Sequence, residues 1–188
     1  MHKKCLFLDR DGVINFDAGY VHTPEQFKFK KDIFDLIKYA NANSYLVVVV
    51  TNQSGIGRGY YSENEFNHLT NWMLDKFKSN GCFIERVYFC PYHPTQGIGC
   101  YKRDSKCRKP LPGMINSAVS SYNIDPTKSL MVGDKMTDIE AGFAAGITEL
   151  FLFNPDEHSM QLSIKSTIPH LIVNSLMDLT FYMSSEVK

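Results

Sequence analysis

KCLFLDRDG, residues 4–12, decides the fold, because an uninterrupted apolar run ends there in two aspartates and a glycine. Continuous apolar runs are typical of strands that helices cover on both faces, as in parallel sheets. A second run, YLVVVVT at residues 45–51, ends in a threonine. Between the two, residues 32–43 repeat apolar side chains at helical spacing. We therefore predict a strand–helix–strand crossover with both strands parallel.

The same alternation continues along the chain. Ser62 and Glu65 form a capping box that predicts a helix ending at Gly81, and Thr137 and Glu140 repeat the pattern. We expect further strands at residues 83–90, 129–132 and 150–153, a helix at 113–122, and an edge strand and closing helix after residue 170. The pattern predicts an α/β, Rossmann-like, doubly wound, mainly parallel sheet. Residues 12–50 leave no room for a large cap domain, and we expect a single domain over residues 1–188.

Composition excludes several classes of protein. The chain has 188 residues with 20 basic and 20 acidic side chains, so no net field favours nucleic acid or an anionic membrane surface. Its longest apolar run, residues 45–50, is far shorter than the roughly 20 residues of a membrane span. Five cysteines, an odd number, argue against a secreted disulfide framework, and no signal peptide is evident. We expect a cytoplasmic monomer that binds a small molecule rather than nucleic acid or a membrane.

Residues 91–112 contain four prolines and no apolar periodicity. A loop of this length inside a compact domain is usually functional. We expect it to contribute to substrate specificity.

Acidic and hydroxyl side chains follow three of the predicted strands. Asp9 and Asp11 come after the first, Thr51 ends the second, and Asp134 comes after the strand at 129–132. Each is also an ordinary turn or cap residue, but the carboxyl ends of parallel strands share one edge, where ligands bind in open α/β sheets. Carboxylate oxygens at that edge predict a Mg²⁺ site formed by Asp9, Asp11 and Asp134.

Five motifs, in this order, resemble the haloacid dehalogenase superfamily, and within it the heptose-bisphosphate and histidinol-phosphate phosphatases. They are FLDRDGVIN (7–15), TNQSGIGRGYY (51–61), CPYHP (90–94), RKPLPGM (108–114) and VGDKMTDIEAG (132–142). The resemblance implies a Mg²⁺-dependent phosphatase that removes the 7-phosphate of D-glycero-D-manno-heptose 1,7-bisphosphate, in the biosynthesis of nucleotide-activated heptose.

The resemblance also implies residue roles. Asp9 would be the nucleophile that forms an aspartyl-phosphate, and Asp11 the general acid and base. Thr51 and Lys109 would hold the transferred phosphoryl group, with Asp138 at most a partner of the metal ligands. A cation is required because a carboxylate about 4 Å from a phosphate dianion, at an effective dielectric near 20, is repelled by roughly 8 kcal/mol. The residues expected to contact substrate are Asp17, Ala18, Gly19, Tyr20, Asn52, Gln53, Ser54, Arg108 and Lys135.

Zinc is a separate question for the long loop. Many members of the family bind zinc there through Cys-x-His and Cys-x-Cys pairs, but in this chain Tyr92 and Ser105 occupy two of those positions. The loop still contains four residues of ligand type, namely Cys90, His93, Cys100 and Cys107. Two alternatives stay open: a structural zinc site with these ligands, or a metal-free loop held by its own packing.

Other functions remain as alternatives. Histidinol-phosphate phosphatase and polynucleotide 3′-phosphatase share the acidic motif, although the neutral charge speaks against the latter. A non-catalytic sugar-phosphate sensor would keep the same fold. Gly55, Gly57 and Gly59 suggest dinucleotide binding, but their GxGxG spacing does not match that motif.

Overall fold

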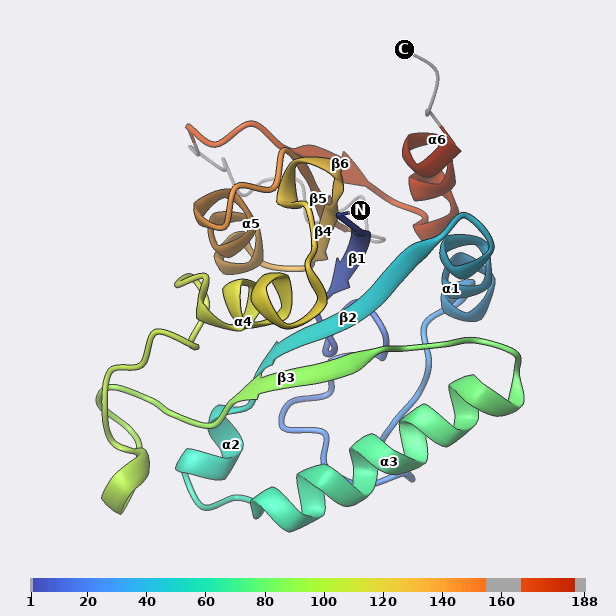
Figure 1. Cartoon of the computed structure of the whole chain (residues 1–188). Helices are drawn as coiled ribbons and strands as arrows, with labels where there is room; N and C mark the ends of the chain where they lie inside the picture. Colours follow the sequence, from blue (N-terminus) through green and yellow to red (C-terminus); the bar gives the residue numbers. More distant parts are fainter. Residues whose placement is uncertain (1, 155–166, 185–188) are drawn as a thin grey trace.

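The computed structural model describes residues 2–154 and 167–184, which contain a six-stranded parallel sheet (Figure 1). The strand order is β3-β2-β1-β4-β5-β6, so β1 lies at the centre and the chain reverses its direction of winding there. The strands are β1 (Lys4–Leu8), β2 (Tyr45–Asn52), β3 (Arg86–Cys90), β4 (Leu130–Gly133), β5 (Glu149–Phe153) and β6 (Leu171–Val173). This arrangement confirms the predicted doubly wound α/β fold.

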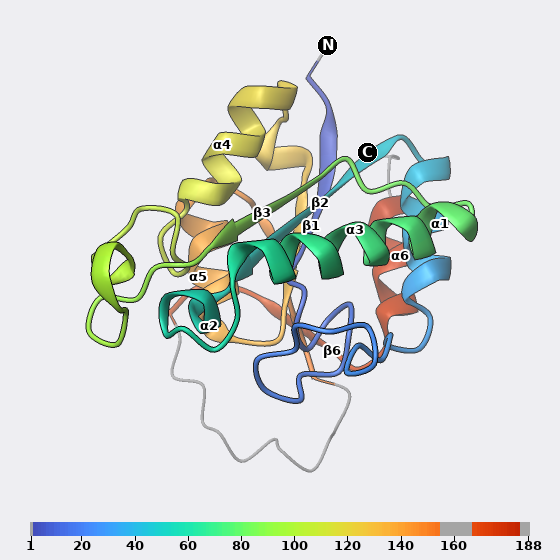
Figure 2. The ribbon, with the colours of Figure 1, turned by 90° about the horizontal axis from the view of Figure 1, so that it is seen from below.

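Helices cover both faces of the sheet (Figure 2). α1, α3 and α6 pack on one face, and α4 and α5 pack on the other. The helices are α1 (Ile33–Ala42), α2 (Ser54–Gly57), α3 (Glu63–Ser79), α4 (Gly113–Tyr122), α5 (Met136–Ala144) and α6 (Leu179–Ser184), with short 3₁₀ turns at Gly99–Tyr101, Pro126–Lys128 and Leu176–Asp178. Within the described part of the chain, no helix has both the length and the apolar character that spanning a bilayer requires.

The alternation of side chains along β1 explains why the strand is apolar throughout. Leu6 and Leu8 pack with α1 and α3, whereas Cys5 and Phe7 pack with α4 and α5. All four side chains are fully buried. Two-sided burial therefore fixes β1 at the centre of the molecule, and its last residue, Leu8, delivers Asp9 to the edge of the sheet.

Most predicted boundaries agree with the structure. The Ser62–Glu65 capping box is formed, since Ser62 N donates to the Glu65 carboxylate at 2.7 Å and Glu65 N donates to the Ser62 hydroxyl at 3.2 Å. The second predicted capping box is wrong. α5 begins at Met136, and the Asp138 carboxylate accepts from Lys135 N at 3.1 Å, so the helix starts before Thr137. The third strand is also shorter than predicted, starting at Arg86.

Candidate active site

The turn after β1 places Asp9 against β4. Asp9 N donates to Val132 O at 3.0 Å, which continues the pairing of the two strands by one residue. Gly12 then turns the chain with φ +94°, and a Cβ at this position would lie 2.2 Å from Asp134 Oδ2. Only glycine lets the turn pass this close to the Asp134 carboxylate. The local sequence Asp9 to Gly12 therefore brings the ends of β1 and β4 together.

Three carboxylates meet at this edge. Asp9, Asp134 and Asp138 each offer an oxygen, and these oxygens lie within 4.8 Å of one another. Asp134 Oδ1 is buried and has no hydrogen-bond partner among the described residues. Hard carboxylate oxygens around a buried, unpartnered acceptor suit a divalent cation such as Mg²⁺. The cluster differs in one member from the set expected from the sequence, because it contains Asp138 in place of Asp11.

Lys109 enters the cluster from the end of the long loop. Its ammonium group contacts Asp9 Oδ1 at 2.9 Å and Asp138 Oδ1 at 2.5 Å, and donates to Val50 O at 2.7 Å. The Asn52 side chain fixes the Lys109 backbone through two hydrogen bonds of 3.0 Å, one to N and one to O. β2 therefore positions Lys109, and Lys109 partly balances the buried negative charge.

Burial and neighbouring charges shift the pKa values of Asp9, Asp134 and Lys109. Burial raises the pKa of Asp9 to about 7, with Asp138 and Asp134 adding to the rise and Lys109 opposing it. Burial likewise raises the pKa of Asp134 to about 6, and Lys135 opposes it. Burial alone would lower the pKa of Lys109, but the carboxylates of Asp138 and Asp9 outweigh it and the pKa is raised. An additional positive charge close to Asp9 and Asp134 would therefore favour their ionised forms.

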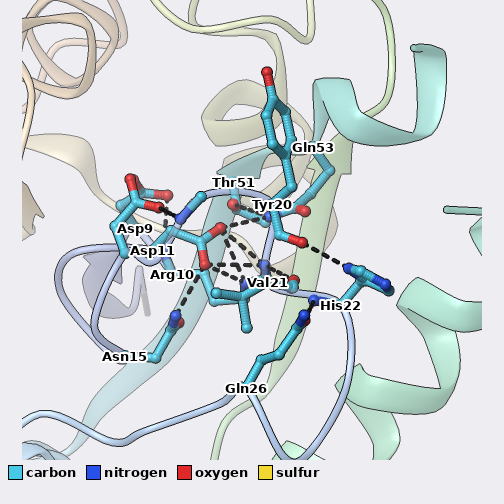
Figure 3. Close-up of polar contacts among 12 residues, drawn as sticks. Asp9, Arg10, Asp11, Asn15, Tyr20, Val21, His22, Gln26, Thr51 and Gln53 are labelled. Atoms are coloured by element: carbon cyan, nitrogen blue, oxygen red, sulfur yellow. Dashed lines mark hydrogen bonds and ion pairs between the residues drawn. The ribbon is translucent and has the colours of Figure 1, made fainter. Parts of the chain in front are cut away.

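Asp11 points to a different set of partners (Figure 3). Arg10 donates from Nε and Nη2 to both carboxylate oxygens at 2.8–3.2 Å, and Asn15 Nδ2 and Gln53 Nε2 each donate at 2.9 Å. Gln53 also donates to Thr51 Oγ1 at 2.8 Å. Asp11 still lines the same pocket as Asp9, so the two carboxylates share a cavity while having different surroundings.

The pocket above these groups has a volume of about 400 Å³. It brings together all four residues expected to be catalytic, and every residue expected to contact substrate except Ala18. The shared lining residues are Asp9, Asp11, Asp17, Gly19, Tyr20, Thr51, Asn52, Gln53, Ser54, Arg108, Lys109 and Lys135. Lys135 Nζ lies 3.1 Å from Asp17, so an ion pair links the loop after β1 to the start of α5.

Two residues of the site were not singled out from the sequence. Arg10 is only 1% exposed and clamps Asp11, and its Nη2 also donates to Val21 O at 2.7 Å. The Tyr61 hydroxyl donates to Gln53 Oε1 at 2.5 Å. The sequence could have predicted an ion pair for Arg10, because an arginine between two aspartates at the end of a buried strand needs a charged partner. Nothing comparable marked Tyr61.

Two of the three glycines after β2 lie inside a helix, and Gly59 follows in an exposed turn. Gly55 and Gly57 are buried in α2, where a Cβ would lie 2.3 Å from the Tyr61 ring and 2.4 Å from Pro91 O, respectively. Close packing of α2 against Tyr61 and the long loop accounts for the repeated glycine.

The four candidate zinc ligands are not gathered at one point. Among the described residues, the cluster of Asp9, Asp134 and Asp138 is the one group of three or more ligand atoms with a common centre. Cys100 is exposed, and His93 Nδ1 accepts from the N–H groups of Thr95 and Gln96 at 3.3 and 3.1 Å. Only Cys90 and Cys107 meet, with their sulfur atoms 2.9 Å apart. The zinc site expected as one alternative is therefore not supported.

Comparisons with known proteins agree with the fold and identify the family. The HAD-hydrolase-like family model matches residues 106–179. The chain is 53% identical to D-glycero-α-D-manno-heptose-1,7-bisphosphate 7-phosphatase of Burkholderia mallei, over 83% of each protein. It is 43% identical to the β-anomer 7-phosphatase of Vibrio cholerae, over 97% of each. The chain belongs to the heptose-bisphosphate phosphatase family of HAD-like hydrolases. Membership confirms the resemblance inferred from the five motifs.

A solved structure of the same family resembles this one closely. It is the D,D-heptose 1,7-bisphosphate phosphatase from B. bronchiseptica, complexed with magnesium and phosphate. The two share 26% sequence identity and a TM-score of 0.81, over 96% of this chain and 97% of the other. Heptose-bisphosphate phosphatases are phosphoric monoester hydrolases, so this chain belongs to a family of enzymes.

Proposed function

We propose that this protein hydrolyses the 7-phosphate of D-glycero-D-manno-heptose 1,7-bisphosphate, with Mg²⁺ as cofactor, in the biosynthesis of nucleotide-activated heptose in the cytoplasm. The observation that carries the proposal is the contact between Asp9 and Lys109 in the pocket, with Asp134 beside Asp9 in the carboxylate cluster. It stands in a chain whose relatives, matched over 83% and 97% of their own length, are 7-phosphatases of this sugar.

Asp9 and Asp134 are the side chains that would hold the cation. Both oxygens of Asp138 are already engaged, one by Lys109 and the other by Lys135 N, whereas Asp134 Oδ1 is unpartnered. We therefore assign Asp138 to positioning Lys109. When bound, Mg²⁺ supplies positive charge that lowers the repulsion between a carboxylate and the phosphate dianion. Asp11 is therefore assigned as the general acid and base.

Asp9 is the nucleophile in this proposal. Arg10 N and Lys109 both contact Asp9 Oδ1, so Oδ2 is the oxygen that attacks phosphorus. The bond between phosphorus and the sugar oxygen breaks, and Asp11 donates its proton to that oxygen. Water then attacks the aspartyl-phosphate, gives its proton to Asp11, and releases inorganic phosphate and the Asp9 carboxylate. Thr51 and Lys109 hold the phosphoryl oxygens during both steps.

Specificity is assigned to the loops at the pocket mouth. Asp17, Gly19 and Tyr20 approach from the β1 side, and Arg108 approaches from the long loop. A guanidinium group can pair with a second phosphate or with sugar hydroxyls through two parallel hydrogen bonds. We therefore assign Lys109 to the transferred phosphoryl group and Arg108 to the second phosphate of the bisphosphate.

A phosphate-release assay tests the proposal. With Mg²⁺, we expect rapid release from both anomers of heptose 1,7-bisphosphate, much slower release from histidinol phosphate, and none from a 3′-phosphorylated oligonucleotide. Asp9→Asn should remove turnover while substrate binding, measured by calorimetry, persists. Wild-type turnover in Asp9→Asn would disprove the nucleophile. Binding without any hydrolysis by the wild-type protein would favour a sensor.

A further inference from the structure

The two cysteines that meet lie at opposite ends of the long loop. Cys90 ends β3 and is fully buried, and Cys107 is half-buried and precedes Arg108 and Lys109 directly. Their sulfur atoms are 2.9 Å apart. The catalytic assignment above uses neither thiol. This contact therefore needs a different explanation.

The surroundings of the pair distinguish the two thiols. The Ser105 hydroxyl lies 3.0 Å from Cys107 Sγ. The hydrogen bond shared by the two thiols lowers the pKa of Cys107 and raises the pKa of Cys90, because one sulfur then carries the negative charge and the other the proton. Cys107 also has partial access to solvent, which Cys90 lacks. Cys107 is thus suited to react first with a small oxidant, and Cys90 to react second.

The loop between the cysteines is held by noncovalent contacts, among them a hydrogen bond between its two ends from Arg108 Nη1 to Tyr92 O at 3.2 Å. Arg103 lies over the Tyr92 ring at 3.9 Å, and Ile98 N donates to Gly57 O at 2.7 Å. Lys102, Arg103 and Lys106 are exposed. These noncovalent contacts are lost when the chain unfolds, so a covalent link between the loop ends would add a constraint that persists in the unfolded chain.

We propose that Cys90 and Cys107 form an oxidisable dithiol, which a hydroperoxide converts to a disulfide that joins the two ends of the long loop beside the active site. The Cys107 thiolate attacks the O–O bond of the peroxide and becomes a sulfenic acid, releasing hydroxide that is protonated to water. The Cys90 thiol then attacks that sulfur, forming the disulfide and releasing a second water. In sum, two thiols and one hydrogen peroxide give one disulfide and two waters.

The geometry predicts a small structural change on oxidation. The sulfur atoms must approach by about 0.9 Å to reach a disulfide bond of about 2.0 Å, so Arg108 and Lys109 should stay in place. The disulfide acts on the unfolded chain instead, and we expect it to raise the thermal midpoint by about 5–10 °C.

The test treats the purified full-length protein with hydrogen peroxide, then alkylates the remaining thiols. Mass spectrometry should show the loss of two hydrogen atoms and a peptide that links Cys90 to Cys107. Trypsin cleavage at Lys102, Arg103 or Lys106 should then give fragments that stay joined until a reductant is added. Neither readout depends on substrate, so failure here is distinct from failure of the proposed phosphatase activity.

Matched variants complete the test. Cys107→Ser should lose both the cross-link and the rise in thermal midpoint, whereas Cys100→Ser, which removes the exposed thiol, should keep both. Oxidised wild-type protein without a Cys90–Cys107 peptide overturns the proposal. The proposal is also overturned if the purified protein contains stoichiometric zinc and the cross-link forms only after a chelator is added.

Discussion

Lys109→Met is the substitution that tests the electrostatics of the site most directly. The Lys109 side chain is 2% exposed and contacts both Asp9 and Asp138, with Asp134 in the same cluster. Methionine keeps most of the side-chain volume but removes the charge, which leaves the carboxylates unbalanced. Removing one partner of a buried ion pair typically costs 3–5 kcal/mol, so we expect a loss of about 4 kcal/mol in unfolding free energy.

The measurement is urea unfolding in EDTA at pH 8, followed by fluorescence of Trp72, the single tryptophan. With a slope of about 2 kcal/mol per molar urea, the midpoint should fall by about 2 M. Lys135→Met is the matched control, because that ammonium is 56% exposed and also pairs with aspartates. Exposed pairs contribute about 1 kcal/mol or less, so its midpoint should move by no more than about 0.5 M.

The penalty for Lys109→Met should depend on pH. Without the ammonium group, the pKa of Asp9 rises further, so the native state binds more protons than the unfolded chain as the pH falls toward 5. Stability of the variant therefore recovers at low pH, and the difference from wild type shrinks. A loss equal to that of Lys135→Met, or a penalty that is the same at pH 5 and pH 8, would refute this account of the cluster.

Three further outcomes follow from the same geometry. Asp134→Asn should weaken Mg²⁺ binding at least tenfold in calorimetry while leaving the fold intact by circular dichroism, and unchanged affinity would remove Asp134 from the metal site. Burial raises the pKa values of Asp9 and Asp134 to about 7 and about 6, so the metal-free native state binds more protons than the unfolded chain between pH 5 and pH 8. The thermal midpoint measured in EDTA should therefore be lower at pH 8 than at pH 5. Added Mg²⁺ should raise the thermal midpoint more at pH 8 than at pH 5. Gly12→Ala should cost more than Gly19→Ala in urea unfolding, because both have positive φ but only the Gly12 Cβ would meet Asp134, and equal losses would contradict the close approach.

The sheet and its functional edge were predictable because burial acts over whole segments. The run from Cys5 to Leu8 is apolar at every position because helices cover both faces of β1. This pattern alone predicts a strand buried inside the sheet, with Asp9 at the sheet edge where the strand ends. The same reasoning placed Thr51 and Asp134 at that edge, and the structure brings all three there.

The pairing of charges within the site was not predictable to the same degree. Asp11 is two residues from Asp9, so an extended chain would point both carboxylates to one side. The turn at Gly12 and the buried Arg10 instead direct Asp11 to its own set of donors. Asp138 stands in the cluster instead, in contact with Lys109 Nζ, and α5, which carries it, begins at Met136. A shift of one or two residues at a helix start is within the usual uncertainty of sequence patterns, yet here it makes Asp138, rather than Glu140, the carboxylate that caps α5.

The long loop shows why residue types alone predict a site poorly. At the sheet edge, parallel strands bring side chains from distant parts of the chain to one place, so a coincidence of aspartates there has a geometric cause. In the loop no regular element does this, and Cys100 and His93 remain apart from Cys90 and Cys107. Tyr92, which stands where the family pattern has a ligand, instead lies under the Arg103 guanidinium group. The loop thus keeps two thiols in contact without a common centre for four ligands. We therefore expect thiol oxidation, rather than metal binding, in this loop.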